Sequence, residues 1–502
     1  MVNWMARLPR QFVGVSTLAA TLTMLHGCAL YRDGAQEVSA YIERDVSLRG
    51  DVGRQYARTA APALDKATSK SAPNETTSES AEVQAHVQED LRDFIVAALQ
   101  HNPDILAAME MARAKLERVR QVTALPDPFV NMKILPEPVR TAEGDNYFIL
   151  DISQKLPVPE KLDRAGRVAV EETRMALRQW QAVRLRVIAD VKRAYYQLYV
   201  IDRSIDVTQA NQDLLRGLVD VARAQVAAGR RSQDDVLRAQ VELSNLEAEL
   251  IMLKQRRVTL VARLNELLDR QATTEVQTPE AFGIRDVALA LDRLMQKAVE
   301  ANPDLARLKH QVERDRQSLD LAKLAYWPDF ALGFEWMPIE PRDAFRPPPN
   351  PTTGQRPVVS KMSEDGSDNW AITFGFSLPI WYDKIKGGIE EASRRLAASR
   401  AAYRSKLNGV SFAVEDALER VESQEKLARL FHDTIIPQAE QAFRVSQASY
   451  SAGTSDFEYV VDNWRKWLVF TIQYYRSMGE LERSVADLEQ AIGRSLSELG
   501  EP

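Results

Sequence analysis

The residue types that most often carry catalysis or bind metals are few in this chain, and their spacing fits neither role. The 502 residues include five histidines and one cysteine. No His-Glu-x-x-His pair, phosphate-binding loop or glycine-rich dinucleotide turn occurs. We therefore expect no enzyme activity, no metal site and no cofactor. The histidines are scattered, at His26, His86, His101, His310 and His432.

The single cysteine, Cys28, is an exception because its surroundings predict a covalent modification. A basic start and an apolar stretch over residues 12–25 are typical of a secretion signal. The following Leu-His-Gly-Cys28 resembles a bacterial lipobox, although His26 occupies a normally small position. A lone cysteine cannot form an internal disulfide. We expect removal of residues 1–27 and acylation (palmitate) of Cys28, giving an outer-membrane lipoprotein; the alternative is an ordinary signal with an incidental cysteine.

Composition limits the partners. The net charge of -6 argues against nucleic acid, because phosphate binding needs a basic surface. No apolar run beyond the N-terminus is long enough for a transmembrane helix. The polar stretch that ends near residue 88 lacks apolar periodicity. We expect residues 28–88 to form a lipidated N-terminal segment and flexible linker.

A short motif occurs twice, 200 positions apart. Asn-Pro-Asp stands at residues 102–104 and again at residues 302–304. Asn is a good N-cap, and Pro is tolerated at the first helical position, so each copy marks a helix start. Two copies in register indicate a duplicated unit. We expect two structural repeats, over residues 91–270 and 291–493.

Each repeat contains a segment whose apolar residues alternate, at about residues 128–156 and 330–380. Period-two alternation predicts strands, here two hairpins with one apolar face each. A soluble sheet packed on helices would give a similar pattern, but aromatic-rich faces about ten residues long favour membrane strands. The apolar positions are Val130, Met132, Ile134, Phe148, Leu150, Ile152, Leu156, Phe330, Leu332, Phe334, Trp336, Trp370, Ile372, Phe374, Phe376 and Leu378.

A very long helix should follow each hairpin, over residues 161–228 and 384–452. Roughly 68 residues at 1.5 Å each give about 100 Å. Pro437 lies inside the second helix and predicts a local kink. Each helix ends at an Ala-Gly turn, with Gly229 and Gly453 suited to the left-handed C′ position. The return helices carry coiled-coil stripes.

Four amphipathic strands cannot close in lipid, so the chain must associate. Every strand edge in a membrane needs a partner, and closure takes at least about eight strands. Two chains would give a barrel filled with side chains, whereas three would leave an aqueous lumen. The predicted fold is mainly α with a membrane β-barrel contribution. With three chains, the assembly would be a twelve-stranded barrel continuous with an α-helical periplasmic tunnel.

These motifs, in this order, resemble the TolC-like outer-membrane efflux proteins. The resemblance covers about residues 91–493, including Ile436-Pro437-Gln438-Ala439 and both Ala-Gly turns. It implies a homotrimeric, passive exit duct held in outer-membrane lipid. Its partners would be a periplasmic adaptor (membrane fusion) protein and an inner-membrane pump.

The resemblance also implies a periplasmic gate near the two turns. Asp235 matches an acidic latch position, and Tyr450 matches a tyrosine of the closed-state network. Asp462 matches a constriction ring, which would favour cations. Tyr459 replaces a second acidic ring, and Ser455 stands where well-studied members carry a latch arginine, so their ion pair cannot form here.

An exported coiled-coil scaffold or adaptor without a barrel is the alternative function. Salt or carbonate would release such a protein from outer membranes, whereas a barrel would require detergent. The exported substrate stays open between heavy metals and drugs or other organic solutes.

Overall fold

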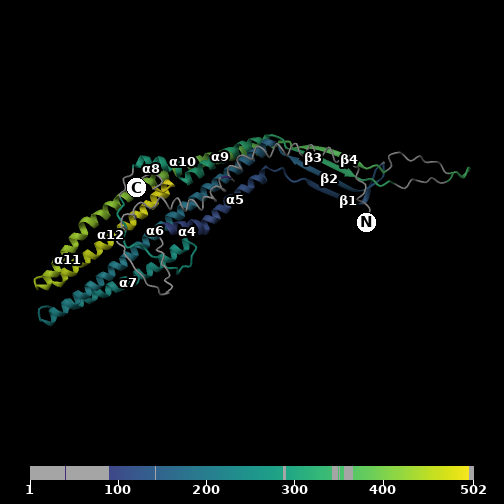
Figure 1. Ribbon diagram of the computed structural model, residues 1–502. Coiled ribbons are helices and arrows are strands. Elements are labelled where there is room, and N and C mark those ends of the chain that lie inside the picture. Colours follow the sequence, from purple (N-terminus) through teal and green to yellow (C-terminus); the bar gives the residue numbers. More distant parts are fainter. Residues whose placement is uncertain are drawn as a thin grey trace, which may run out of the picture. The chain divides into compact units, whose positions relative to one another are not determined.

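The described part of the chain forms two compact units. We name them the sheet unit, which lies within Ala114–Thr173 and His310–Arg400, and the helical unit, which comprises residues 90–113, Arg174–Lys309 and the residues from Ala401 onward. The predicted signal peptide, Cys28 and, apart from residue 40, the predicted linker lie outside the described residues. The computed structural model (Figure 1) describes residues 40, 90–141, 143–285, 290–341, 349, 351–355 and 366–496.

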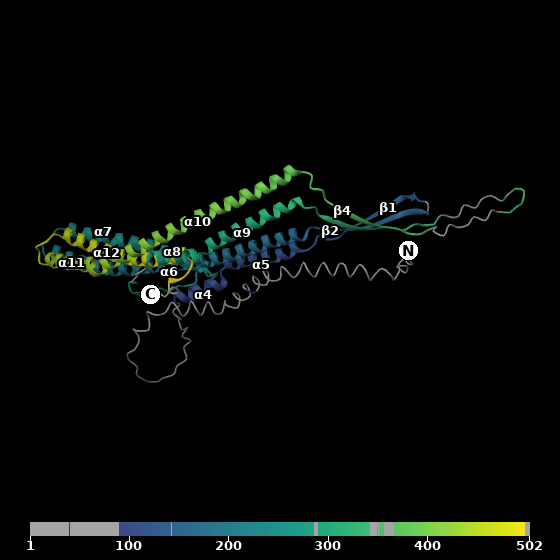
Figure 2. The ribbon, with the colours of Figure 1, turned by 90° about the horizontal axis from the view of Figure 1, so that it is seen from above.

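The sheet unit is built on one antiparallel sheet with the strand order β1-β2-β3-β4 (Figure 1), which Figure 2 shows from above. The two hairpins predicted from alternation meet at its centre, where Ile152 of β2 lies opposite Phe334 of β3. Strands β1 and β4 each have one neighbour among the described residues, so each has an open edge. The strands are β1 (Phe129–Arg140), β2 (Asp145–Leu156), β3 (Phe330–Met337) and β4 (Asn369–Phe376).

One face of this sheet is apolar and exposed. Val130, Ile152, Phe334 and Ile372 form a row across the four strands. The exposure of this face reaches 80% at Phe374. A sheet packed on helices would bury these side chains, so the exposure favours the interpretation as membrane strands.

Strand β4 ends earlier than the alternation through Leu378 predicted. The N–H of Ser377 donates to the carbonyl of Asp329 at 2.8 Å. The Ser377 hydroxyl in turn accepts a hydrogen bond from the Asp329 N–H at 2.8 Å. Pro379 follows and has no N–H to continue a ladder. These contacts end the strand at Phe376, and residues 377–381 connect it to the helix that begins at Tyr382.

The same series of helices occurs in the first half of the chain (residues 91–285) and in the second half (residues 291–496). The short first pair has 11 and 21 residues in each half. The first half contains α4 (Leu91–His101), α5 (Pro103–Thr123), α6 (Pro159–Ala227) and α7 (Gln233–Leu267). The second half contains α8 (Leu291–Ala301), α9 (Pro303–Lys323), η1 (Leu324–Tyr326), α10 (Tyr382–Leu430), η2 (Phe431–Ile435), α11 (Ile436–Ser451) and α12 (Phe457–Ile492).

The Asn-Pro motif begins a helix in each half and fastens that start to the end of the return helix. The Asn102 side chain accepts hydrogen bonds from the N–H groups two and three residues on, at 3.0 and 3.3 Å. Its Nδ2 donates to the carbonyl of Leu267 at 2.9 Å. Asn302 makes the same contacts, and its Nδ2 donates to the Ala491 carbonyl at 2.8 Å. In each half, one asparagine side chain thus caps the start of one helix and binds it to the end of the return helix.

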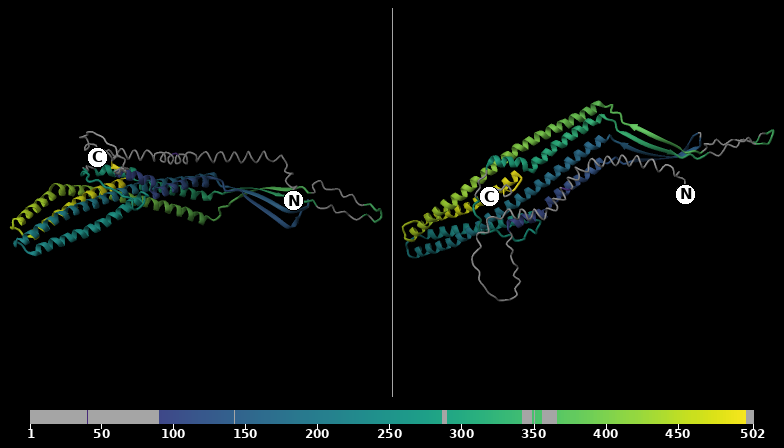
Figure 3. Two further views of the ribbon diagram at one scale, coloured as in Figure 1. Left: turned by 60° about the horizontal axis from the view of Figure 1, so that its bottom comes forward. Right: turned by 45° about the horizontal axis from the view of Figure 1, so that its top comes forward.

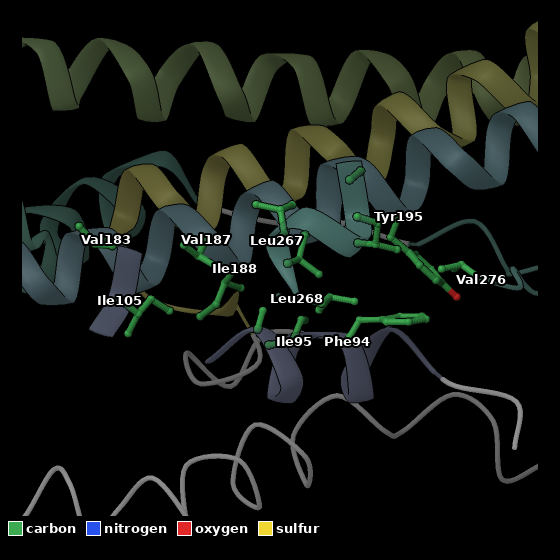
Figure 4. Close-up of a cluster of buried hydrophobic side chains, with 14 of the residues drawn as sticks. Phe94, Ile95, Ile105, Val183, Val187, Ile188, Tyr195, Leu267, Leu268 and Val276 are labelled. Atoms are coloured by element: carbon green, nitrogen blue, oxygen red, sulfur yellow. The ribbon is translucent and has the colours of Figure 1, made fainter. Parts of the chain in front are cut away.

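Each half has its own hydrophobic core at corresponding places. Figure 4 shows the core of the first half, where Phe94 and Ile95 of α4 meet Tyr195 of α6 and Leu267 of α7. The core of the second half contains matching residues of α8, α10 and α12, including Leu294, Val414, Leu418 and Leu488. The two cores share no residue.

The long helix of the second half is not uniform. The 69-residue α6 is a single α-helix, whereas its counterpart is divided into α10, the five-residue π-helical segment η2 and α11. The N–H of Ile436 bonds to the carbonyl of Phe431, five residues back. The π-turn accommodates Pro437, which has no N–H to donate. It also absorbs the one residue by which this long helix exceeds α6.

A third cluster of buried side chains joins the two long hairpins, α6/α7 and α11/α12. These four helices lie side by side in the helical unit (Figure 3). The cluster includes Leu215, Ala239, Tyr450 and Trp464. Gly479 of α12 packs on α6 so closely that an added Cβ would lie 2.2 Å from Val200.

Arg257 stands in the leucine stripe of α7, between Leu253 and Leu260, and has a role of its own. Its Nε donates to Asp202 of α6 at 2.7 Å, and a second nitrogen donates to the Val276 carbonyl at 2.9 Å. Thr278 donates to the same carboxylate at 2.7 Å. The arginine therefore holds the segment after α7 against α6.

Candidate functional site

The two Ala-Gly turns have the same backbone design. Gly229 and Gly453 adopt φ angles of 67° and 82°, in the left-handed region that favours glycine. In each turn the glycine N–H and the next N–H bond back to the helix end, at 2.9 and 3.0 Å. Such paired bonds satisfy carbonyls that a helix end leaves free. Helix α7 then begins after Ser232, and α12 begins after Asp456.

Two of the predicted gate residues meet beside these turns. The hydroxyl of Tyr450, on α11, donates to Oδ2 of Asp235, on α7, at 3.1 Å. Tyr450 is fully buried, and its ring packs on Phe457 with 5.2 Å between centroids. The contact connects the second hairpin to the first at their turns.

The pKa of Tyr450 is raised, so its hydroxyl keeps the proton that it donates. Burial is the main cause of the increase, and the Asp235 carboxylate adds to it by its charge and its hydrogen bond. Arg231 acts in the opposite direction. The phenol is therefore a hydrogen-bond donor throughout the physiological pH range.

Arg231 was not among the residues predicted from the sequence. Its guanidinium pairs with Asp456 at 3.0 Å and donates to the carbonyls of Gly453, at 3.3 Å, and Ser455. Its Cζ lies 5.4 Å from the centroid of the Tyr450 ring. A signal was present in the sequence: Arg231 follows Gly229 by two positions, as Ser455 follows Gly453.

Two further polar contacts join the hairpins along the helices. The indole N–H of Trp464 donates to Asn211 at 2.9 Å in a buried position. Arg465 donates twice to the Glu242 carboxylate, once at 3.2 Å and once at a shorter distance. The Glu242 side chain is 11% exposed. Neither pair was expected, because its members are far apart in the sequence.

The other gate candidates, Asp462 and Tyr459, lie on exposed parts of α12. Asp462 is paired with Lys466 of the same helix at 2.7 Å, and its side chain is 52% exposed. Tyr459 is 60% exposed. Of the four candidates, Asp235 and Tyr450 are therefore the pair that a hydrogen bond joins within the described chain.

The described residues offer no site for a metal: no three His, Cys, Asp or Glu side chains are grouped to hold one. His310 contacts Glu171 at 2.8 Å, and His432 contacts Asp433 at 2.7 Å. Each of these contacts joins one histidine to one carboxylate. No described helix is both long and apolar enough to cross a membrane.

Comparison with known proteins identifies one family. The cobalt-zinc-cadmium resistance protein CzcC of Cupriavidus metallidurans is 21% identical over 381 residues, which are 75% of this chain and 83% of CzcC. The outer membrane protein VceC of Vibrio cholerae has a similar fold, with a TM-score of 0.65 and 18% identity over 81% of this chain and 96% of that one.

The open-state outer membrane channel MtrE of Neisseria gonorrhoeae gives a TM-score of 0.65 and 17% identity, over 81% of this chain and 89% of that one. The outer membrane efflux protein family matches twice, over residues 94–270 and 294–494, once in each half. These matches extend through both cores and both hairpin turns. The chain therefore belongs to the outer membrane efflux protein family.

Proposed function

We propose that this chain is the exit duct of a tripartite efflux system in the bacterial outer membrane. It would conduct passively what an inner-membrane pump and a periplasmic adaptor deliver. Family membership across both halves supports this function. The structural observation that carries it is the exposed apolar face of the four-stranded sheet, which includes Ile134 and Phe374. Such side chains on the outside of a barrel would face lipid.

The open edges of the sheet support a closed assembly of several chains. In lipid, unpaired edges are too costly to persist, so β1 of one copy would pair with β4 of the next. Three copies would give twelve strands and an aqueous lumen. The opposite face suits that lumen, because Asp151 lies directly opposite Glu335 on it.

An exposed stripe on α7 supports the same association between helices. Leu237, Val241, Ile251 and Val258 are 54–69% exposed and recur at heptad spacing. They lie apart from the buried stripe with which α7 packs inside the chain. A solvent-facing heptad stripe on a helix needs a partner helix. Helices of a neighbouring copy would supply it, and the assembly would be a homotrimer.

In this duct the hairpin turns would form the periplasmic gate. The Tyr450–Asp235 hydrogen bond supports a closed state in which the two hairpins are held together. Three copies of Asp462 around the axis would form a cation-attracting constriction, with Tyr459 beside it. Asp462→Ala should raise single-channel conductance or abolish block by multivalent cations, whereas Asp220→Ala, a similarly exposed carboxylate, should not. Unchanged conductance and block would remove Asp462 from the constriction.

Acylation of Cys28 would add a lipid anchor to the barrel. The lipobox-like sequence supports it. Mass spectrometry of the mature chain should show an acylated N-terminal cysteine, and Cys28→Ser should lose that mass while the protein stays detergent-extractable. A mature N-terminus at another residue would contradict the anchor.

The exit-duct function is tested by reconstitution and extraction. The purified protein should give discrete conductance steps in planar bilayers, and only detergent should release it from outer membranes. Release by carbonate without conductance would favour the scaffold alternative. The likeness to CzcC supports heavy-metal ions as the substrate class; deletion should then sensitise cells to zinc, cobalt and cadmium salts rather than to organic drugs.

A further inference from the structure

The two hairpin turns differ at one matching position. The first turn contains Arg231 two residues after its glycine, and the second contains Ser455 there. The cation of the first turn reaches across to the second, so one residue carries three polar contacts between the hairpins. Gln225 adds a hydrogen bond to the Ser451 carbonyl at 3.2 Å. Both side chains bind main-chain oxygens of the second turn.

We propose that Arg231 is the clasp of the closed gate, and that it holds the second turn chiefly through backbone carbonyls. This inference rests on the proposed channel function. In this proposal the positive charge that holds the two turns together comes from the first turn, because the second turn has no basic residue. Because a carbonyl is present whatever the side chain, the clasp does not require a particular residue at position 455.

The ion pair with Asp456 and the hydrogen bonds to main-chain carbonyls differ in how much water surrounds them. The Asp456 side chain is 88% exposed, whereas the Arg231 side chain is 20% exposed. A pair with such a solvated carboxylate contributes little, because water screens it. One guanidinium nitrogen, Nη2, donates to the carbonyls of both Gly453 and Ser455, while Nη1 faces Asp456. A lysine keeps the charge but not this planar arrangement of donors, so it would replace the contacts only in part. Arg231 also covers the ring of Tyr450, so it shields the second link to Asp235.

The charges of the second turn favour the binding of Arg231. The end of α11 presents carbonyl oxygens, and a helix C-terminus attracts positive charge. Asp456 stands at the start of α12, and its carboxylate makes no capping hydrogen bond within that helix. Arg231 lies between the carbonyl oxygens at the end of α11 and the Asp456 carboxylate. Its removal would leave turn carbonyls to water and expose the phenol beneath it.

The experiment compares single-channel recordings of the full-length protein in planar bilayers. Arg231→Ala should raise the open-state population about tenfold, the size expected for loss of a hydrogen-bonded charge. Arg230→Ala is the matched control: it removes the adjacent exposed arginine, whose side chain makes none of these contacts, and should behave as wild type. Arg231→Lys should be intermediate, and Asp456→Asn should be close to wild type.

Hydrogen exchange in detergent gives a second measurement that does not depend on conductance. Arg231→Ala should speed amide exchange in residues 449–457 and leave residues 102–112 unchanged. Exchange accelerated throughout the chain would mean general unfolding and would overturn a specific clasp.

The remaining outcomes separate the inference from the function on which it rests. A wild-type protein without conductance would overturn the channel itself. A conducting wild type with Arg231→Ala indistinguishable from Arg230→Ala, in recordings and in exchange, would overturn the clasp alone. An Asp456→Asn effect as large as that of Arg231→Ala would overturn the carbonyl mechanism, because the ion pair would then hold the turn.

Discussion

Asn102 and Asn302 occupy matching places in the two halves and make the same hydrogen bonds, each to its own return helix. Arg231 and Ser455 also occupy matching places, yet the first donates hydrogen bonds and the second accepts one. Each asparagine binds only residues of its own half, so the same residue and the same hydrogen bonds serve in both halves. The turn residues act between the halves, where two surfaces must be complementary rather than alike.

Like the two asparagines, the two hydrophobic cores have matching positions in the two halves. Leu264 and Leu488 lie at the same place relative to the carbonyls that bind Asn102 and Asn302, and both are fully buried. The content of the cores differs, since Tyr195 in α6 stands where Leu418 stands in α10. Position is maintained, and side-chain chemistry is free to vary if the volume is filled.

The largest expected effect tests whether the two cores are independent. Leu264→Ala and Leu488→Ala should each lower the free energy of unfolding by about 2–5 kcal/mol, because each leaves a cavity in a packed core. Urea unfolding in detergent, followed by circular dichroism, measures this. The double variant should show the sum, since distant sites with no shared partners add. A strong departure from the sum would mean that the cores act as one; Val299→Ala, at an exposed site on α8 outside the α7 stripe, is the control.

Loss of the paired asparagines should have the next largest effect. Asn102→Ala and Asn302→Ala should each cost about 1–3 kcal/mol, because a cap is lost and a buried carbonyl loses its donor. Asn102→Asp keeps the capping oxygen but cannot donate to Leu267, so it isolates the second contribution. Unequal losses at the two positions would break the equivalence of the halves.

High pH should affect residues 187–199 of α6 more than the matching residues 410–422 of α10. Burial raises the pKa of Tyr195, Tyr196 and Tyr199 in α6, and Glu482 raises that of Tyr196 further. The ordinary tyrosine pKa is about 10. Their contribution is therefore complete below about pH 10 and is lost as the pH rises above it, because the unfolded chain releases protons that the native chain holds.

The measurement is amide exchange across residues 187–199 and 410–422 as the pH is raised, with tyrosinate absorbance recorded in parallel. The matching stretch of α10 contains no tyrosine. Equal sensitivity of the two stretches, after correction for the intrinsic pH dependence of exchange, would contradict the tyrosines as the cause.

The smallest effect tests the shared backbone of the turns. Gly229→Ala and Gly453→Ala should each cost about 1 kcal/mol through the left-handed φ, since no atom crowds either position. Gly217→Ala, inside α6, should be stabilising by a similar amount because Ala favours a helix. Thermal unfolding distinguishes the signs. A neutral result at one turn only would show that its geometry relaxes.

The sequence predicted the elements whose causes are local. Period-two alternation located all four strands, and the Asn-Pro motif located the starts of α5 and α9. Helix lengths followed from proline and glycine positions. The end of β4 and the π-turn before Pro437 were missed in detail, because both depend on which particular N–H group finds an acceptor.

The candidate site was predicted only in part because its contacts cross between hairpins. Asp235 and Tyr450 were chosen by resemblance and lie together. Arg231 was missed because its partners include main-chain carbonyls, which leave no pattern in a sequence. Trp464–Asn211 and Arg465–Glu242 were missed because only the packing of four helices brings these side chains together. The roles of Asp462 and Tyr459 stay predictions that depend on neighbouring copies.

The open edges of β1 and β4 have a kinetic consequence. A chain that has formed its helices still has main-chain donors and acceptors on both outer strands, beside an oily surface. In the proposed assembly only another copy pairs with these edges, so the last step of maturation would be a collision between chains. The rate of that step depends on concentration, and until it occurs the strands can join the wrong partner. Such a protein would need escort in the periplasm, and its yield on overexpression would depend on how quickly copies meet at the membrane.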